Sequence, residues 1–411
     1  MTLNKKYIFS WTLFDFANSS FSAVIMAVIF PVYYINVIAF NKDQAGDFWW
    51  GAAVSLSMAV VALTSPFLGG IADYGGKRKR FLFIYTFICV ATVACFSLLK
   101  PGMVFTGFIL IVIANIGMEG GLVFYNSFLP EIAPADYQGR VSAWGFMVGY
   151  AGSIISLLIS ISLINAGKIE LIWIMVALFF SIFSIPAFVY LQPDANENSL
   201  CASGLKGIKY TWLNIKNIWK RKEARKFLIA YFIYEDGVNT IIIFSSIFAA
   251  LTLGFKTKEL IGLYLLVQIT ALIGSLIMAK PIDIYGPKKI VIITLILWVS
   301  VCIFAFFVET KIQFWLLSSF AGLGLGSVQA AARAFFTQFV TKGCEAEYFG
   351  IYSLVGKSSA VLGPILFAHI SAVFGSQRPA VLSIAALFFI GLVILITVKG
   401  GEPNIKTNLQ E

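Results

Sequence analysis

Apolar segments long enough to cross a membrane follow one another along almost the whole chain, and this feature limits the fold more than any other. A helix needs about 20 apolar residues to cross the hydrocarbon core of a bilayer. Of the 411 residues, 59% are hydrophobic and 12% are charged, whereas a soluble domain carries about 25% charged residues. Twelve candidate spans can be delimited: 8–34, 49–72, 81–99, 103–128, 141–166, 169–191, 227–251, 260–279, 290–308, 312–336, 348–374 and 379–398.

The class of membrane fold follows from the backbone. Only helices and closed barrels satisfy every backbone hydrogen bond inside lipid, and none of the spans shows the alternating pattern of a barrel strand. The basic start MTLNKKYIF precedes an apolar run that is too long for a signal peptide, so we interpret it as the beginning of the first span. We therefore predict an all-α membrane protein with twelve transmembrane helices.

The positive charges predict the orientation of these helices. Most of the 30 lysines and arginines lie in the loops that share a side with the N-terminus, and such a bias marks the cytoplasmic side. We expect a multi-pass protein with both termini in the cytoplasm. The same distribution explains the net charge of +10 by basic loops that face anionic lipid, so we expect no nucleic acid partner.

Three short patterns occur twice and indicate a duplicated chain. GGIADYGGKRKR after the second span and AKPIDIYGPKK after the eighth place an aspartate and a glycine in the same positions, and DFAN in the first span returns as DGVN in the seventh. A set of small residues around the fifth span also recurs around the eleventh: Gly139, Ser142, Gly145 and Gly152, then Gly350, Ser353, Gly356 and Gly363. We predict two six-helix pseudo-repeats, 1–191 and 227–411, joined by a cytoplasmic linker, 192–226.

The linker contains an amphipathic segment. Its apolar side chains follow helical spacing, with lysines on other faces: Leu205, Ile208, Trp212, Ile215 and Trp219. The pattern fits a helix that lies on the membrane surface and fits equally well a helix packed beneath the bundle.

These patterns resemble a known family of membrane proteins. Two six-helix halves with a GxxxDxxGxKR-like loop resemble the major facilitator superfamily. More specific stretches are similar to its Unknown Major Facilitator family, the bacterial relatives of the autophagy-linked vacuole effluxer: FDFANSSF, FYNSFLPEIA, RVSAWGFMVGYAGS, YEDGVNT, GLGLGSVQAAAR and EAEYFGIYSLVGKSSAVLGP. The resemblance implies a location in the cell inner membrane and a central cavity lined by spans one, four, seven and ten.

Polar side chains inside the spans are the candidate site for solute or protons. A charge at the middle of a span costs about 2.5 to 3.5 kcal/mol, so these groups must face the interior of the bundle, take a partner or bind a proton. They fall mainly on the four spans that the resemblance places around the cavity: Asp15, Asn18, Glu119, Asn126, Glu235, Asp236, Asn239, Gln329, Arg333 and, on span eleven, Lys357.

Charge pairing inside the membrane gives a specific expectation. The resemblance places span eleven beside span seven, so we predict an ion pair between Asp236 and Lys357. Two of the four acids would still lack a basic partner, and an unpaired Asp15 or Glu119 could load and release a proton. The alternative roles are structural: Asp15 could hold the two halves in register, and Glu235 is as readily structural as functional.

The repeated loops provide a candidate gate. The resemblance implies that their acids pair with nearby bases and helix ends to hold one conformation: Gly69, Asp73, Gly76, Lys77, Arg78, Asp283 and Gly286. Arg333 and Asn126 lie near cytoplasmic helix ends, where snorkelling of a long side chain is an alternative explanation.

The predicted function is secondary active transport of a small polar solute by alternating access. An amino acid is the solute implied by the eukaryotic relative, and a proton is the expected coupling ion. A drug or metabolite efflux carrier and a non-transporting membrane sensor are the alternatives. One histidine and scattered cysteines give no catalytic or metal-binding pattern, so we expect no enzyme activity, metal or cofactor. We also expect a monomer.

Overall fold

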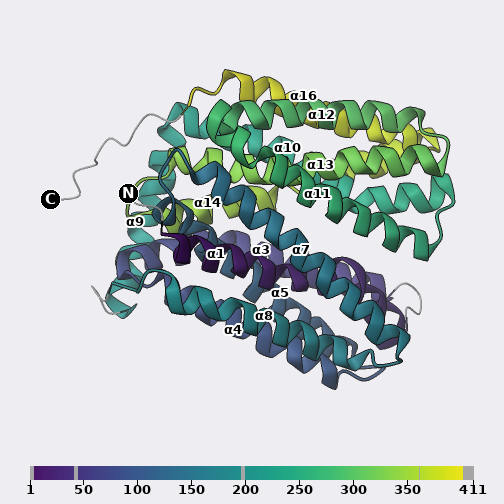
Figure 1. Cartoon of the computed structure of the whole chain (residues 1–411), viewed down its shortest axis with the longest axis horizontal. Helices are drawn as coiled ribbons and strands as arrows, with labels where there is room; N and C mark the ends of the chain where they lie inside the picture. Colours follow the sequence, from purple (N-terminus) through teal and green to yellow (C-terminus); the bar gives the residue numbers. More distant parts are fainter. Residues whose placement is uncertain (1–3, 41–44, 196–199, 361, 401–411) are drawn as a thin grey trace.

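Two bundles of helices lie side by side in the computed structural model, which describes residues 4–40, 45–195, 200–360 and 362–400 (Figure 1). The first bundle contains α1 (Lys5–Ser20), α2 (Phe30–Tyr33), α3 (Ala45–Gly75), α4 (Arg78–Cys95), α5 (Val104–Ser127), α6 (Leu129–Ile132), α7 (Gln138–Asn165) and α8 (Glu170–Tyr190). The second contains α10 (Lys222–Leu253), α11 (Thr257–Tyr285), α12 (Pro287–Phe307), α13 (Lys311–Phe336), α14 (Glu345–Ser358), α15 (Leu362–Phe374) and α16 (Gln377–Thr397). Helix α9 (Leu200–Lys220) connects them.

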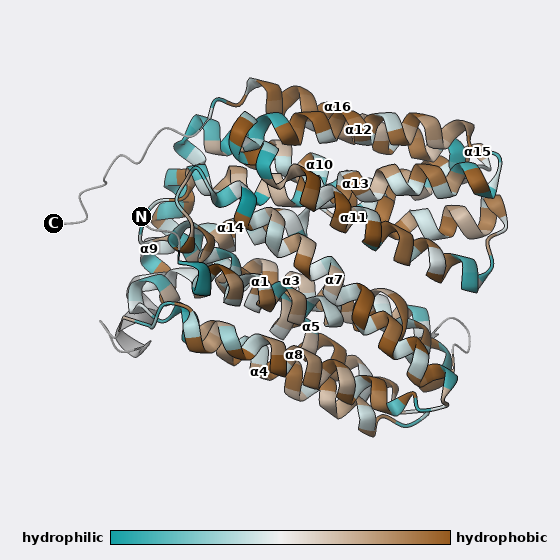
Figure 2. Ribbon diagram, viewed as in Figure 1, coloured by the Kyte–Doolittle hydropathy of each residue, from teal (hydrophilic) through white to brown (hydrophobic). Residues whose placement is uncertain are grey.

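The predicted all-helical membrane fold is confirmed. Eleven helices in the described residues are long and apolar enough to cross a membrane, and a bent pair of segments makes a twelfth. Figure 2 shows hydrophobic residues along the lengths of the helices and hydrophilic residues concentrated near their ends. Large apolar side chains such as Phe83, Phe87 and Phe304 are exposed on the outside of the bundles, which is the surface that hydrocarbon would cover.

The first and eleventh spans differ from the continuous helices that we predicted. The first consists of Lys5–Val28 and Phe30–Ile38, bent by 42°, and residues Phe21–Val28 form a π-helix. Proline at position 31 begins the second segment, where its missing N–H and fixed φ favour a new helix start. The eleventh span is divided into α14 and α15, and Val361 between them lies outside the described residues.

Two glycines make the turns that follow α3 and α11. Gly76 has φ +61° and Gly286 has φ +89°, which are conformations that a side chain strongly disfavours. Each turn is followed at once by a new helix, α4 or α12. The duplicated glycine of the sequence motif therefore allows a tight reversal at the same end of both bundles. We call this end the basic end, because Lys77, Arg78 and Lys288 lie in these turns or at the start of the helices that follow them.

The two bundles contact each other closely near the basic end. Helix α3 packs against α14, and α7 packs against α11. A Cβ atom on Gly350 would lie 2.5 Å from the carbonyl oxygen of Ser65, and a Cβ on Gly69 would collide with the carbonyl of Ala346. The small residues at these positions therefore allow backbone contact between the halves.

Helix α9 packs beneath the bundle along one side, as one of the two arrangements left open by its sequence requires. Thr211 and Ile218 are fully buried, and Gly207 lies against Ile71 of α3. Ile208, Trp212 and Trp219 are instead 46%, 55% and 50% exposed, while the side chain of Leu205 lies outside the described residues. One side of α9 thus packs beneath the bundle, and another remains uncovered.

Candidate functional site

A buried arginine connects both halves at the centre of the site. Arg333 of α13 donates from Nε to Ser142 Oγ at 2.9 Å, from Nη2 to the Ser142 carbonyl at 2.8 Å and from Nη1 to Asn126 Oδ1 at 3.0 Å. Its Nη1 also lies 3.6 Å from Asp15 Oδ2. The side chain of Arg333 is 4% exposed, so it is an interior ion-pair partner, and the snorkelling alternative for Arg333 and Asn126 is wrong.

Aromatic rings enclose this arginine. Its guanidinium carbon lies 4.2 Å from the ring centre of Phe146 and 4.7 Å from that of Trp11, within the range of a cation–π interaction. Trp11 in turn donates from Nε1 to the Tyr125 carbonyl at 2.9 Å. The guanidinium therefore has donors, charge and faces all occupied by protein groups.

The second ion pair of the site joins Lys357 to Glu119. Lys357 Nζ of α14 lies 2.7 Å from Glu119 Oε2 of α5, and the two side chains are 29% and 15% exposed. Our prediction that Lys357 pairs with Asp236 is therefore wrong. Lys357 instead contacts Glu119 of the first half, and Asp236 contacts the start of α15.

Asp236 has a structural partner instead. It is fully buried, and its Oδ2 accepts the backbone N–H of Gly363 at 2.8 Å. Gly363 is the second residue of α15, where helix N–H groups need an external acceptor. Asp236 thereby stabilises the new helix start after the break in the eleventh span.

The distribution of paired acids reverses our expectation. Asp15 and Glu119, which we expected to be free to load a proton, both lie beside a cation. Glu235 makes no hydrogen bond or ion pair within the described ranges, although Lys357 is close enough to interact with it electrostatically. Of these two glutamates, Glu119 is the one in contact with Lys357.

The remaining predicted polar residues lie in the same region. Asn18 donates to Asp15 Oδ1 at 3.4 Å, and Asn239 donates to Ser359 Oγ at 3.4 Å. Tyr150 of α7 donates to Gln329 Oε1 of α13 at 2.7 Å, which adds a further contact between the halves.

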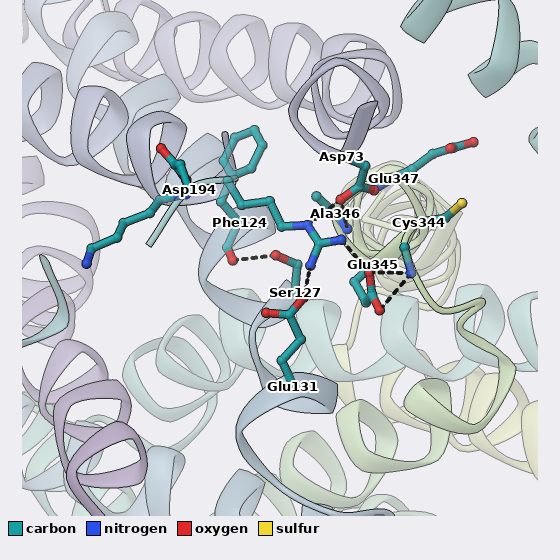
Figure 3. A network of polar contacts seen from close by, with 12 residues as sticks. Asp73, Phe124, Ser127, Glu131, Asp194, Cys344, Glu345, Ala346 and Glu347 are labelled. Carbon is teal, nitrogen blue, oxygen red and sulfur yellow. Dashed lines mark hydrogen bonds and ion pairs between the residues drawn. The ribbon is translucent and has the colours of Figure 1, made fainter. Parts of the chain in front are cut away.

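The first repeated loop forms a cluster of charged contacts at the basic end, which we call the seal (Figure 3). It consists of Asp73, Arg78, Glu131 and Glu345. Arg78 contacts three carboxylates, those of Asp73, Glu131 and Glu345. Asp73 also accepts the backbone N–H groups of Ala346 at 3.2 Å and Glu347 at 2.8 Å. Because Glu345, Ala346 and Glu347 begin α14, this loop joins the end of α3 to the other half.

The second repeated loop makes the equivalent contact. Asp283, near the end of α11, accepts the backbone N–H of Arg140 at 3.1 Å, and Arg140 Nε lies 3.2 Å from Asp283 Oδ2. Arg140 is the third residue of α7, as Glu347 is of α14. Each half therefore provides an aspartate that caps a helix of the other half.

Several residues of the site escaped sequence reasoning. Glu131 and Glu345 each lie in the first turn of a helix, where acids are common, so neither stood out. Ser142 was noted only as a repeated small residue, and Tyr150 was not noted at all. The one signal in the sequence was Arg78, whose position in the acidic loop motif indicated that it would have carboxylate partners.

Cys344 lies within the seal as the residue before α14. Burial, together with the nearby carboxylates of Asp73, Glu347 and Glu345, raises the pKa of its thiol to about 12. Because the thiolate is the form that reacts with alkylating reagents, the thiol reacts only slowly while the seal is closed.

Comparison with known proteins agrees with this architecture. Residues 51–402 match the model of the family described as vacuole effluxer Atg22 like. The MFS-type transporter YxiO of Bacillus subtilis (strain 168) is 31% identical over 402 residues, which cover 94% of this chain and 93% of the relative. The chain belongs to the Atg22-like family of the major facilitator superfamily.

Solved structures show the fold of this Atg22-like transporter. The human organic anion transporter MFSD10 is similar with a TM-score of 0.75 at 12% identity, covering 95% of this chain and 98% of that one. The proton:xylose symporter XylE has a TM-score of 0.71 at 14% identity, covering 96% and 95%. Both similarities extend over the two bundles, so the arrangement of helices is that of the superfamily.

Proposed function

We propose that this chain is a secondary transporter that carries a small polar solute, with an amino acid as the substrate class, and couples its movement to that of protons. The observation that carries this proposal is the Glu119–Lys357 ion pair, which joins the two halves at 2.7 Å while both side chains remain partly exposed. A partly exposed pair can be opened by a competing solute at lower cost than a buried one.

The chemistry of this pair favours a solute with both charges. A carboxylate could replace Glu119 beside Lys357, and an ammonium group could then bind the released Glu119 or the neighbouring Glu235. Arg333 is less suited to this role because protein groups occupy its donors. The family description as a vacuole effluxer is consistent with a small metabolite.

Proton coupling rests on the single cation beside the two glutamates. Lys357 forms an ion pair with Glu119 and none with Glu235, and a carboxylate that lacks a cation inside a span is costly to keep charged. Binding of a solute carboxylate to Lys357 would remove the stabilising cation and favour proton uptake. Binding of the solute and binding of the proton would thus be coupled.

The orientation that we propose places the basic end in the cytoplasm of the bacterial inner membrane. The bias of lysine and arginine in the loops supports this assignment. The seal around Arg78 and the cap on Asp283 would then close the site from the cytoplasm, and rocking of the bundles would break these contacts.

Uptake into proteoliposomes tests the proposal. The purified protein would be supplied with a mixture of radiolabelled amino acids under an imposed pH gradient, and Glu119→Gln would be compared with the wild type. We expect at least a tenfold loss of gradient-driven uptake in Glu119→Gln. Glu259→Gln is a matched control, because Glu259 forms a 2.8 Å ion pair with Lys311 inside one half. Equal uptake by Glu119→Gln and wild type would show that the proposed site is wrong.

A further inference from the structure

The linker helix α9 carries an uncovered apolar stripe. Ile208, Trp212 and Trp219 are all about half exposed, at 46%, 55% and 50%. At about 100° per residue these three positions fall within an arc of about 40° on the helix. Two tryptophans and an isoleucine aligned in this way form a continuous apolar surface, unlike scattered exposed residues, which need no explanation.

The side of α9 that faces the bundle, roughly 110° around the helix from the stripe, is firmly attached. Thr211 lies against Gly70 of α3 and Gly207 against Ile71. Asn214 donates to Glu347 Oε2 of α14 at 3.0 Å. The apolar stripe is therefore held in a fixed direction, and its exposure does not result from a detached helix. Figure 1 shows α9 crossing the ends of the spans near α14.

Lysines border the stripe on one side. Three exposed lysines lie about 80° to 120° around the helix from Ile208: Lys209, Lys216 and Lys220. Lys216 Nζ lies 5.6 Å from the ring centre of Trp212. A row of aromatic and aliphatic side chains beside a row of lysines is the pattern of a helix that lies in the interface of a bilayer.

We infer that the exposed side of α9 binds the anionic phospholipid surface of the membrane in which the bundles are embedded. Ile208, Trp212 and Trp219 would enter the boundary between headgroups and acyl chains, and the three lysines would contact lipid phosphates. The bilayer is favoured over a soluble protein because α9 lies at the ends of the spans, where the apolar exterior of the bundles meets the headgroups. Charge complementarity selects anionic lipid.

Spin labelling of the full-length protein in nanodiscs tests this inference. A nitroxide would be placed at Trp212 or, as a matched control, at Asn217, which is exposed on the opposite side of α9. Nanodiscs of phosphatidylcholine alone would be compared with nanodiscs that contain phosphatidylglycerol. Accessibility to oxygen reports the acyl region, and accessibility to a water-soluble nickel chelate reports solvent.

The expected result is that the label at position 212 is accessible to oxygen and protected from nickel, while the label at 217 shows the reverse. Protection at 212 should increase with phosphatidylglycerol. Replacement of Lys209, Lys216 and Lys220 by glutamine should lower the preference for phosphatidylglycerol over phosphatidylcholine by about fivefold per lysine. Nickel access at 212 equal to that at 217, or a lipid preference that the triple variant keeps, would overturn the inference.

Discussion

Removal of Arg78 should open the basic end of the transporter. Arg78 contacts Asp73 and Glu131 in its own half and Glu345 in the other half. Only the contact with Glu345 must break when the halves separate. In Arg78→Ala, Glu345 would lie beside two carboxylates without their shared cation, so the closed state loses an attraction and gains a repulsion.

The size of this effect can be worked out from the burial of the cluster. The side chains of Arg78 and Glu345 are 12% and 5% exposed, and breaking a buried ion pair costs about 3 to 5 kcal/mol. Because Arg78 keeps some solvent contact, we take the lower value of about 3 kcal/mol, which corresponds to a change on the order of 100-fold in the ratio of open to closed molecules.

Cys344 provides the assay. In the closed seal its pKa of about 12 leaves about 1 thiol in 10,000 as thiolate at pH 8. Once hydrated, the thiol should return to a pKa of about 8.5, with about a quarter as thiolate at pH 8. The rate of alkylation by N-ethylmaleimide therefore follows the population of the open state, in a background where the other four cysteines are replaced by serine.

We expect Arg78→Ala to accelerate alkylation of Cys344 by one to two orders of magnitude. In the wild type the closed-state contribution to the rate should rise tenfold per pH unit. The rate of the variant should instead level off near about pH 10, because the open-state thiol is then almost fully ionised. Lys79→Ala is the matched control, since the Lys79 side chain donates to the Leu191 carbonyl of its own half, at 2.8 Å. A folded Arg78→Ala protein with the wild-type rate would refute the reasoning.

Three further predictions follow from the helix contacts. Gly350→Val should also accelerate labelling of the seal thiol, because even a Cβ at this position lies 2.5 Å from the Ser65 carbonyl and forces the halves apart. Asp236→Ala should lower the free energy of unfolding by about 1 to 2 kcal/mol through loss of a helix cap, as measured by thermal unfolding in detergent. Asp236→Asn should keep most of this stability, because the amide oxygen can still accept from Gly363. Equal loss in both variants would contradict the capping role. Arg333→Lys should reduce uptake at least tenfold without changing expression, since an ammonium cannot reproduce the divergent donors of the guanidinium, and unimpaired uptake would contradict its bridging role.

The sequence predicted features that depend on polarity and periodicity. Apolar length gave the spans, and the resemblance implied that the duplicated aspartates at 73 and 283 pair with bases and helix ends, as their contacts show. Both features can be predicted from separate segments of the sequence, because lipid and helix geometry constrain each span separately. The glycines at 139 and 350 were likewise predictable as sites of close helix contact.

Features that depend on helix rotation and on distant partners were not predictable. The partners of Asp236 and Lys357 were mistaken, because a single sequence gives no measure of the direction in which each helix turns its side chains. The break between α14 and α15 was also missed, because the residues on both sides remain apolar enough to read as one span. Glu345 became important only when packing brought it to Arg78, 267 positions away.

The most direct test of the account measures distances across both ends of the bundle by pulsed electron paramagnetic resonance. One pair of nitroxides would be placed at Arg80 and Lys342 at the basic end, and another at Lys168 and Glu309 at the far end, all exposed positions. Rocking of rigid halves predicts that Arg78→Ala lengthens the first distance and shortens the second. A longer first distance with an unchanged second distance would contradict alternating access, because it would mean that only the seal had loosened.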